Sequence, residues 1–234
     1  MQNCDFLKNI ELLTTADGSK TIFNPQVGEN YHSKHGAVQE SQHVFVNSGL
    51  QFYHQQTQNK EISILEIGFG TGLNFLLSAE YAASTGLKLS YTGIEAYPLP
   101  QNILNETGYN SFLNSESLFD RFMSNYHSCF DESTQIIDQV NLKIENSTLL
   151  AYNGVGKFDI IYFDAFAKVH QQEMWTEESI KHACKFLKDK GIFVTYSVTG
   201  DLKRQLKGFG FEIERPQGAA GKREMMRATL PYVL

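Results

Sequence analysis

The chain has 234 residues, of which 41% are hydrophobic and 20% charged, a composition that suits one generous globular domain although length alone permits two. With 18 Gly, 5 Pro and 12% aromatic residues, collagen-like and disordered classes are excluded, because enough apolar material is present to offset the entropy of folding. No basic segment precedes an apolar run at the N-terminus, and residues 62–77 are too short and too polar to span a bilayer. We therefore expect a soluble, cytoplasmic protein without a membrane partner.

Cysteine and histidine spacing gives no sign of a metal. The three cysteines lie far apart, with no CxxC pair. His32, His35 and His43 lie within a dozen residues, but without a Cys or a paired HxxxH they are read as surface or loop histidines. We expect neither a disulfide framework nor a metal site.

Charge is distributed unevenly along the chain. The formal net charge is −6, whereas residues 203–227 contain seven Lys or Arg and three Glu, a balance of +4, which leaves −10 on the rest. A basic segment on an acidic body concentrates positive potential where an anionic polymer could lie. The alternative is a solvated surface without a partner.

The first sixty residues differ in pattern from the rest. Two apolar runs, 10–15 and 20–23, flank an Asp17-Gly18 pair, which predicts a hairpin with a type I′ turn. A helix is expected from Ser33 to about residue 47, with Gly49 placed to end it. We treat residues 1–60 as an extension packed on a main domain of residues 61–234.

From residue 61 onward, short β-branched runs alternate with helical periodicity. Expected strands lie at 62–67, 87–94, 140–144, 158–163, 192–196, 209–213 and 225–232. Expected helices lie at 73–83, 99–107, 116–130, from 176 to a basic last turn before Gly191, and at 201–207. This alternation predicts an α/β fold with an open, mostly parallel sheet covered by helices on both faces.

In such sheets ligands bind at the carboxyl ends of the strands. The first strand ends in a glycine-rich turn in which a backbone can approach a ligand closely, with the sequence Glu66, Ile67, Gly68, Phe69, Gly70, Thr71, Gly72. Leu73 stands where a dinucleotide fingerprint needs Gly or Ala, and Glu95 ends the second strand, where an acid can bind ribose hydroxyls. A nucleoside ligand without a pyrophosphate is indicated, and S-adenosylmethionine is the commonest such cofactor.

Two further strand ends carry polar residues. Glu145 and Asn146 follow the third strand and are candidates for reading an adenine edge, or simply begin a turn. Asp164, followed by Ala165 and Phe166, ends the apolar fourth strand, where a carboxylate is costly to bury without a partner. Asp164 either accepts hydrogen bonds from an amine or caps a neighbouring loop.

Residues 65–76 (LEIGFGTGLNFL) resemble the signature of the methyltransferase domain of the MnmC family, the tRNA 5-methylaminomethyl-2-thiouridine biosynthesis enzymes. Further segments agree in the same order: 31–36 (YHSKHG) with Glu40, 95–99 (EAYPL), 163–166 (FDAF) with 173–176 (EMWT), 203–213, and 221–225 (GKREM). The resemblance spans about residues 30 to 228. It implies a class I, Rossmann-like methyltransferase fold with a seven-stranded sheet and an antiparallel last strand.

The resemblance also implies the reaction, which is methylation of the 5-aminomethyl group on wobble uridine 34 of tRNA. Asp164 would orient the amine and relay its proton. The resemblance implies cofactor ligands in the glycine-rich turn, at Glu95 and at residues 164–166, and further ones at Tyr31, Ser33 and Asn74. The candidate substrate contacts are Trp175, Lys222 and Arg223. For Tyr31 and Ser33 the alternative is an ordinary helix entry, and for Trp175 a packing anchor.

The chain also departs from the family pattern. Residues 167–172 (AKVHQQ) lack the family's prolines, and Glu145-Asn146 stands in place of Gly-Asp. The flavin-dependent oxidase domain of fused relatives has no room in 234 residues, so a stand-alone methyltransferase is expected. A transferase for small-molecule amines and a non-catalytic nucleoside-binding module remain the alternatives.

Overall fold

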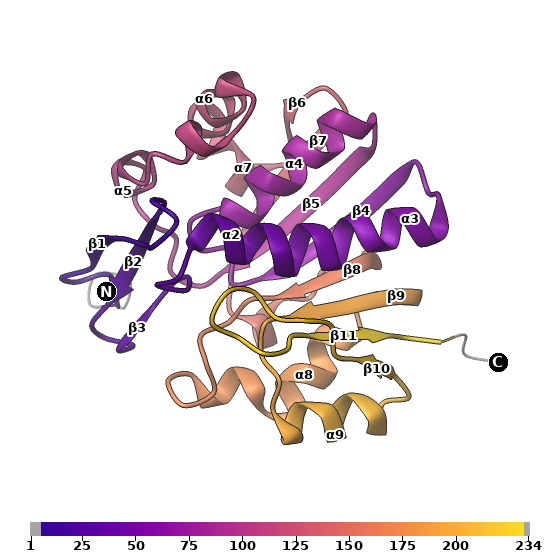
Figure 1. Ribbon diagram of the computed structural model, residues 1–234. Coiled ribbons are helices and arrows are strands. Elements are labelled where there is room, and N and C mark those ends of the chain that lie inside the picture. Colours follow the sequence, from indigo (N-terminus) through magenta and orange to yellow (C-terminus); the bar gives the residue numbers. More distant parts are fainter. Residues whose placement is uncertain (1–5, 232–234) are drawn as a thin grey trace.

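The computed structural model describes residues 6–231 and contains one large sheet with helices on both faces (Figure 1). Within these residues the large sheet has eight strands. Their order is β10 (Glu212–Glu214), β11 (Met226–Thr229), β9 (Leu187–Thr195), β8 (Phe158–Phe163), β4 (Glu61–Ile67), β5 (Lys88–Glu95), β7 (Val140–Asn146) and β6 (Thr134–Ile137). The five strands from β9 to β7 are parallel, whereas β11 runs antiparallel to β9, as expected for the last strand.

The sheet has one strand more than the seven expected. The expected helix over 116–130 is divided into α6 (Glu116–Asn125) and α7 (Ser128–Asp131), and the chain then forms β6 antiparallel to β7. Nζ of Lys143 in β7 donates to the Phe130 carbonyl at 2.7 Å near the end of α7. Only Ile136 of the four β6 residues is buried, so the sequence contains little apolar signal for this edge strand. Tyr232, at the end of the expected last strand, lies outside the described residues.

Alternating side chains of the central strands build two hydrophobic layers. Ile160 and Tyr162 of β8 face a layer that includes α4 (Leu73–Thr85), whereas Ile161 and Phe163 face the opposite layer. The opposite layer is covered by α8 (Glu177–Cys184) and α9 (Gly200–Gly208). The remaining short helices connect strands: α5 (Gln101–Glu106), η2 (Tyr109–Phe112), η3 (Leu149–Ala151) and η4 (Gln172–Trp175). A central strand buried on both sides is typical of a parallel sheet.

A long N-terminal helical run packs on the sheet face that carries α4 (Figure 1). It comprises α2 (Ala37–Ser41), the wider turns of η1 (Gln42–Gln51) and α3 (Phe52–Thr57), and ends at Gln58 in the left-handed conformation. The expectation that Gly49 ends this helix is wrong. A Cβ on Gly49 would lie 2.9 Å from Cε1 of Tyr162, so glycine here permits close contact between the helix and β8. The proposed boundary near residue 60 falls between α3 and β4.

The N-terminal hairpin is present, but its turn differs from the expected type I′. β1 (Glu11–Thr14) pairs antiparallel with β2 (Lys20–Asn24), which pairs with β3 (Glu29–Asn30). Residues 15–19 form the loop, and only Gly18 has a positive φ (87°). Asp17 instead accepts hydrogen bonds within the loop, and its Oδ2 accepts one from Gln39 N in α2 at 3.0 Å. These side-chain bonds replace the turn geometry that the Asp-Gly pair predicts.

The helix expected to run up to Gly191 is shorter. It begins at Thr176 as predicted, where the Thr176 hydroxyl caps the helix by accepting from Ser179 N at 3.2 Å, but α8 ends at Cys184. The basic stretch that follows belongs to β9, in which Lys190 has a φ of 62° and the pairing with β8 shifts register. Gly191 lies inside this strand, where a Cβ would come within 2.7 Å of Leu187 Cγ.

Two absences hold for the described part of the chain. Among residues 6–231 no helix is long and apolar enough to cross a membrane. In the same residues no group of three or more His, Cys, Asp and Glu side chains is placed to hold a metal ion.

The contact between Gly49 and Tyr162 predicts a steric effect on stability. We expect Gly49→Val to lower the free energy of unfolding by about 1–3 kcal/mol, because the added side chain overpacks the helix against β8. Gly208→Val at the open end of α9 is the matched control, since a Cβ there meets nothing within 4 Å. Urea denaturation measures both, and equal midpoints for the two variants would contradict the packing argument.

Candidate active site

A cavity of about 530 Å³ opens at the carboxyl ends of the parallel strands. Its lining comes from the turn after β4, the ends of β5 and β8, the segment after β7, and residues 29–34 of the N-terminal extension. Predicted site residues that line the cavity are Tyr31, Ser33, Gly68, Phe69, Gly70, Thr71, Asn74, Glu95, Asp164, Ala165, Phe166 and Lys222. The structure therefore brings together residues separated by nearly the whole chain.

The glycine turn after β4 has a backbone that other residues rarely adopt. Gly68 has a φ of 88°, and a Cβ on it would lie 2.5 Å from the carbonyl oxygen of Asp164. Gly70 has a φ of 52°, with the Tyr31 ring 3.0 Å from a Cβ position. Both glycines line the cavity, whereas Gly72 packs against Phe69 and Phe122 behind it. The turn thus presents backbone to a ligand at the start of α4.

Glu95 closes β5 at the cavity wall and is held by the backbone on both sides. Its Oε2 accepts from Gly70 N at 2.8 Å and its Oε1 from Tyr97 N at 2.9 Å. Burial raises the pKa of Glu95, while these backbone hydrogen bonds favour the ionised form. A carboxylate has about four acceptor positions, so Glu95 keeps capacity for a ligand's hydroxyl groups.

One amide group joins two carboxyl groups at the floor of the cavity. Nδ2 of Asn74 donates to Glu66 Oε1 at 2.7 Å and to Asp164 Oδ2 at 2.8 Å. Glu66 is fully buried and also accepts from the hydroxyl of Tyr91 at 2.9 Å. Burial, together with the charge of Asp164, raises the pKa of Glu66 well above its usual value. Glu66 therefore supports Asn74 from behind and does not line the cavity.

Asp164 lies among charged groups from distant segments. Burial raises its pKa to about 7, and the negative charges of Glu40 and Glu29 act in the same direction. The hydrogen bond from Asn74 and the charge of Lys222 act in the opposite direction. A carboxyl group with a pKa near neutrality can exchange a proton at physiological pH.

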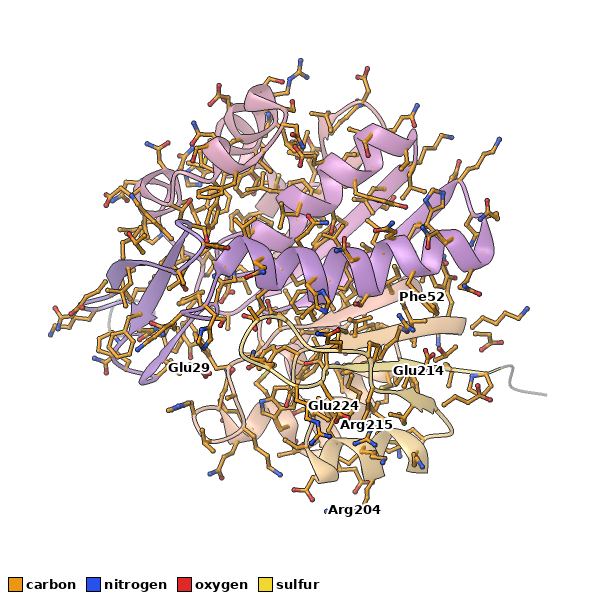
Figure 2. The ribbon with its side chains drawn as sticks, in the orientation of Figure 1. Glu29, Phe52, Arg204, Glu214, Arg215 and Glu224 are labelled. Atoms are coloured by element: carbon orange, nitrogen blue, oxygen red, sulfur yellow. The ribbon has the colours of Figure 1, made fainter. Side chains whose placement is uncertain are left out.

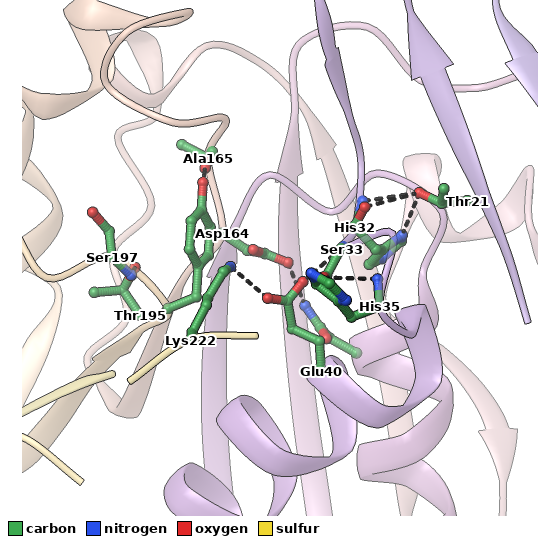
Figure 3. Close-up of polar contacts among 12 residues, drawn as sticks. Thr21, His32, Ser33, His35, Glu40, Asp164, Ala165, Thr195, Ser197 and Lys222 are labelled. Carbon is green, nitrogen blue, oxygen red and sulfur yellow. Dashed lines mark hydrogen bonds and ion pairs between the residues drawn. The ribbon is translucent and has the colours of Figure 1, made fainter. Parts of the chain in front are cut away.

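Lys222 reaches this site from the loop before β11 (Figure 3). Its Nζ lies 2.5 Å from Glu40 Oε1 and 4.0 Å from the centroid of the Tyr196 ring. Glu40 Oε2 in turn accepts from the backbone N of Ser33 at 2.9 Å, and the Tyr196 hydroxyl donates to the Ala165 carbonyl at 2.8 Å. These contacts join the N-terminal extension, the end of β8 and the C-terminal loop around one side of the cavity.

Several predicted site residues lie elsewhere. Glu145 and Asn146 are in the last part of β7, and the cavity is lined instead by residues 147–150, directly after them. Trp175 is buried outside the cavity, where its Nε1 donates to the Phe166 carbonyl at 2.7 Å. Arg223 is exposed next to Lys222 and does not line the cavity.

Other cavity residues were absent from the expected site. They include Glu29, Asn30, His32, Lys34, Glu40, Tyr97 and Tyr196. Burial lowers the pKa of His32 to about 4, which keeps its ring neutral at pH 7. Glu40 and Tyr97 stand inside segments that carry the family resemblance, whereas no local pattern marks Glu29 or Tyr196 as belonging to a site.

Comparison with known proteins identifies the class. The model of a family described as S-adenosyl-L-methionine-dependent methyltransferase matches residues 114–231, and the chain belongs to this family. The protein is thus a methyltransferase that uses S-adenosylmethionine. The cavity has a volume typical of small-molecule sites. Three features of its lining fit this cofactor: the two glycines at which a ligand can approach the backbone closely, the carboxylate of Glu95, and the buried Oδ1 of Asn74, which has no hydrogen-bond partner in the protein.

Curated relatives of this chain share one name. The tRNA 5-methylaminomethyl-2-thiouridine biosynthesis bifunctional protein MnmC of Burkholderia thailandensis is 28% identical over 221 residues, which cover 88% of this chain and 33% of the relative. The MnmC protein of Vibrio campbellii is 26% identical over 96% of this chain and 36% of its own. The chain spans about a third of the length of these curated relatives.

A solved structure matches the fold across almost the whole chain. MnmC2 from Aquifex aeolicus superimposes with a TM-score of 0.75 at 23% identity, covering 97% of this chain and 73% of that one. The match agrees with a class I methyltransferase fold, which the sequence predicted, with β6 as an additional edge strand.

Proposed function

We propose that this methyltransferase methylates a primary amine, the 5-aminomethyl group of the wobble uridine of tRNA. The proposal rests on the position of Asp164, whose carboxyl group lines the same cavity as the glycine turn. Burial raises the pKa of this group to about 7. A second support is the name of the curated relatives, which describes biosynthesis of a methylaminomethyl uridine in tRNA. Methylation of an aminomethyl group is the step that forms such a product.

The proposed chemistry assigns the proton to Asp164. S-adenosylmethionine supplies an electrophilic methyl group when bound. The acceptor amine is protonated in water at neutral pH and reacts only as the free base. This side of the cavity contains three carboxyl groups, those of Glu29, Glu40 and Asp164, and one ammonium group, that of Lys222. The excess of acidic groups favours entry of a cation. Asp164 Oδ takes the proton from the ammonium group, and the hydrogen bond from Asn74 keeps the carboxylate in place.

The cofactor contacts follow from the same cavity. We assign the ribose hydroxyls to Glu95 and the methionine part to the turn and the end of β8, with Tyr31, Ser33, Asn74, Ala165 and Phe166 around it. The adenine ring is assigned to residues 147–150 in place of Glu145 and Asn146, because only the former line the cavity.

The proposed tRNA partner needs cationic groups near the cavity. Four basic side chains of the 203–227 segment are paired with carboxylates: Arg204 with Asp201, Arg215 with Glu224, Lys222 with Glu40 and Arg227 with Glu214. Figure 2 labels Arg204, Arg215, Glu214 and Glu224, and Figure 3 shows the pair of Lys222 and Glu40. We assign phosphate contacts to Arg223, which is exposed next to the cavity residue Lys222, and to Lys34, which is exposed and lines the cavity. An acceptor tRNA would place the enzyme in the cytoplasm.

Removal of the Glu95 carboxylate should weaken cofactor binding. A charge-assisted hydrogen bond is worth ~1.5–3 kcal/mol, so Glu95→Ala should raise the dissociation constant of S-adenosylmethionine by roughly one to two decades. Calorimetric titration measures the constant, and Glu61→Ala is the matched control, because Glu61 lies at the amino end of β4 and outside the cavity. A constant within twofold of wild type would remove the ribose assignment.

The role of Asp164 predicts a pH dependence. The ionised form accepts the proton, so the single-turnover rate should fall as the pH drops below about 7, the pKa of Asp164. Asp164→Asn keeps the size of the side chain but cannot accept the proton. We expect it to remove the fall of the rate at low pH and to slow methylation about tenfold or more. An unchanged rate and pH profile in Asp164→Asn would contradict the assignment.

The acceptor is tested with labelled methyl groups. We expect incorporation of tritiated methyl into bulk tRNA from a strain that lacks the modification. Binding of this tRNA should weaken with salt, and Arg223→Ala should reduce the logarithmic slope by about one unit, since each neutralised phosphate contributes ~0.7–0.9.

Lys60→Ala is the matched control for this salt dependence, because Lys60 is exposed directly before β4, at the amino ends of the parallel strands and outside the cavity. Incorporation into a small amine but not into tRNA would contradict the proposed acceptor. An unaltered slope in Arg223→Ala would contradict the phosphate assignment alone.

A further inference from the structure

The N-terminal extension lies along the loop that follows Asp164. We call residues 165–171 the acceptor loop. Glu29, at the start of β3, accepts a hydrogen bond from the backbone N of Ala167 through Oε2 at 2.7 Å. On one side of this bond the Tyr31 and Phe166 rings meet edge to face, with centroids 5.1 Å apart. On the other side a Cβ position on Gly28 lies 3.6 Å from Nδ1 of His170.

The acceptor loop contains no proline and is held by hydrogen bonds. The Phe166 N donates to Oε1 of Gln171 at 3.2 Å, and the Ala167 carbonyl accepts from the His170 and Gln171 backbones. Trp175 donates from its ring to the Phe166 carbonyl. Of the acceptor loop's backbone N–H groups, that of Ala167 is the one bonded to a side chain from the N-terminal extension. Because the acceptor loop begins beside Asp164, its conformation shapes the acceptor side of the cavity.

We propose that Glu29 is a positioning residue that fixes the acceptor loop and thereby the acceptor side of the cavity. Its carboxylate lines the cavity and reaches the acceptor loop from β3 (Figure 2). The inference rests on the proposed function for the identity of the acceptor, but the anchoring itself does not. A proline would restrict the backbone of the acceptor loop from within. In this chain the hydrogen bond from Ala167 to Glu29 of the N-terminal extension restricts it instead.

Trp175 provides a readout that is independent of activity. It is the only tryptophan in the chain, it is 3% exposed, and it is bonded to the acceptor loop. In Glu29→Ala we expect acrylamide to quench its fluorescence more strongly than in wild type. Glu29→Gln keeps an acceptor oxygen and should retain the wild-type quenching. Glu11→Ala, an exposed carboxylate on β1, is the matched control.

KM and the pH dependence of the rate should distinguish the anchoring of the acceptor loop by Glu29 from the effect of its charge. Glu29→Ala should raise KM for the tRNA acceptor about tenfold, as for the loss of one charge-assisted hydrogen bond, with the cofactor dissociation constant within about twofold. Glu29→Gln should raise KM clearly less than Glu29→Ala, because the hydrogen bond to the acceptor loop is kept and only the charge is lost. It should also shift the fall of the rate at low pH to lower pH, because the Glu29 charge raises the pKa of Asp164.

Unchanged Trp175 quenching in Glu29→Ala would overturn the proposal, as would equal quenching in Glu29→Gln and Glu29→Ala. Lost cofactor binding with an unchanged KM would also overturn it. If wild type fails to methylate tRNA, the proposed acceptor is wrong, whereas the quenching comparison still decides the anchoring.

Discussion

The arrangement of the site depends on two carboxyl groups that end neighbouring parallel strands and share one amide nitrogen. Glu66 in β4 and Asp164 after β8 both accept from Nδ2 of Asn74. Two charged carboxylates this close would repel each other in a poorly solvated site, and the donor between them offsets part of that cost. Asn74 reaches this place because the positive-φ glycines turn the chain sharply from β4 into α4. The glycine turn therefore forms one wall of the cavity and also aims the donor that holds Asp164.

The sheet alone would leave the cavity open on one side. The long N-terminal helical run carries Glu40, and the segment before it carries Ser33, so these residues face Asp164 only because the run packs on β8 and β9. The close contact of Gly49 with Tyr162 sets how near the helix can lie to the sheet. Lys222 then bonds to Glu40 from the opposite end of the chain. Core packing far from the chemistry thus determines which charges surround the carboxyl group.

Cavity residues could be predicted from the sequence where they belong to a local pattern. The glycine turn and Asp164 directly follow a strand and Glu95 ends one, and parallel topology brings these strand ends together at the cavity. Glu145 and Asn146 show the limit of this reasoning, because β7 continues to residue 146 and moves the loop that lines the cavity beyond them. Glu29 and Tyr196 could not be found in this way, since they meet the cavity through tertiary contacts between distant segments. The charge count of the basic segment likewise could not reveal which of its side chains are paired, because the pairing of Arg215 and Arg227 with glutamates depends on the register of β10 and β11.

The most direct test of this account is the titration of Asp164 itself. Carbon-13 NMR of carboxyl-labelled protein follows each aspartate with pH, and Asp164→Asn identifies the resonance. The account predicts a midpoint near 7 for Asp164, because burial and the neighbouring carboxylates oppose its ionisation. A midpoint near 4, the value of an ordinary solvated aspartate, would contradict the claim that this side of the cavity is built to take a proton from an amine.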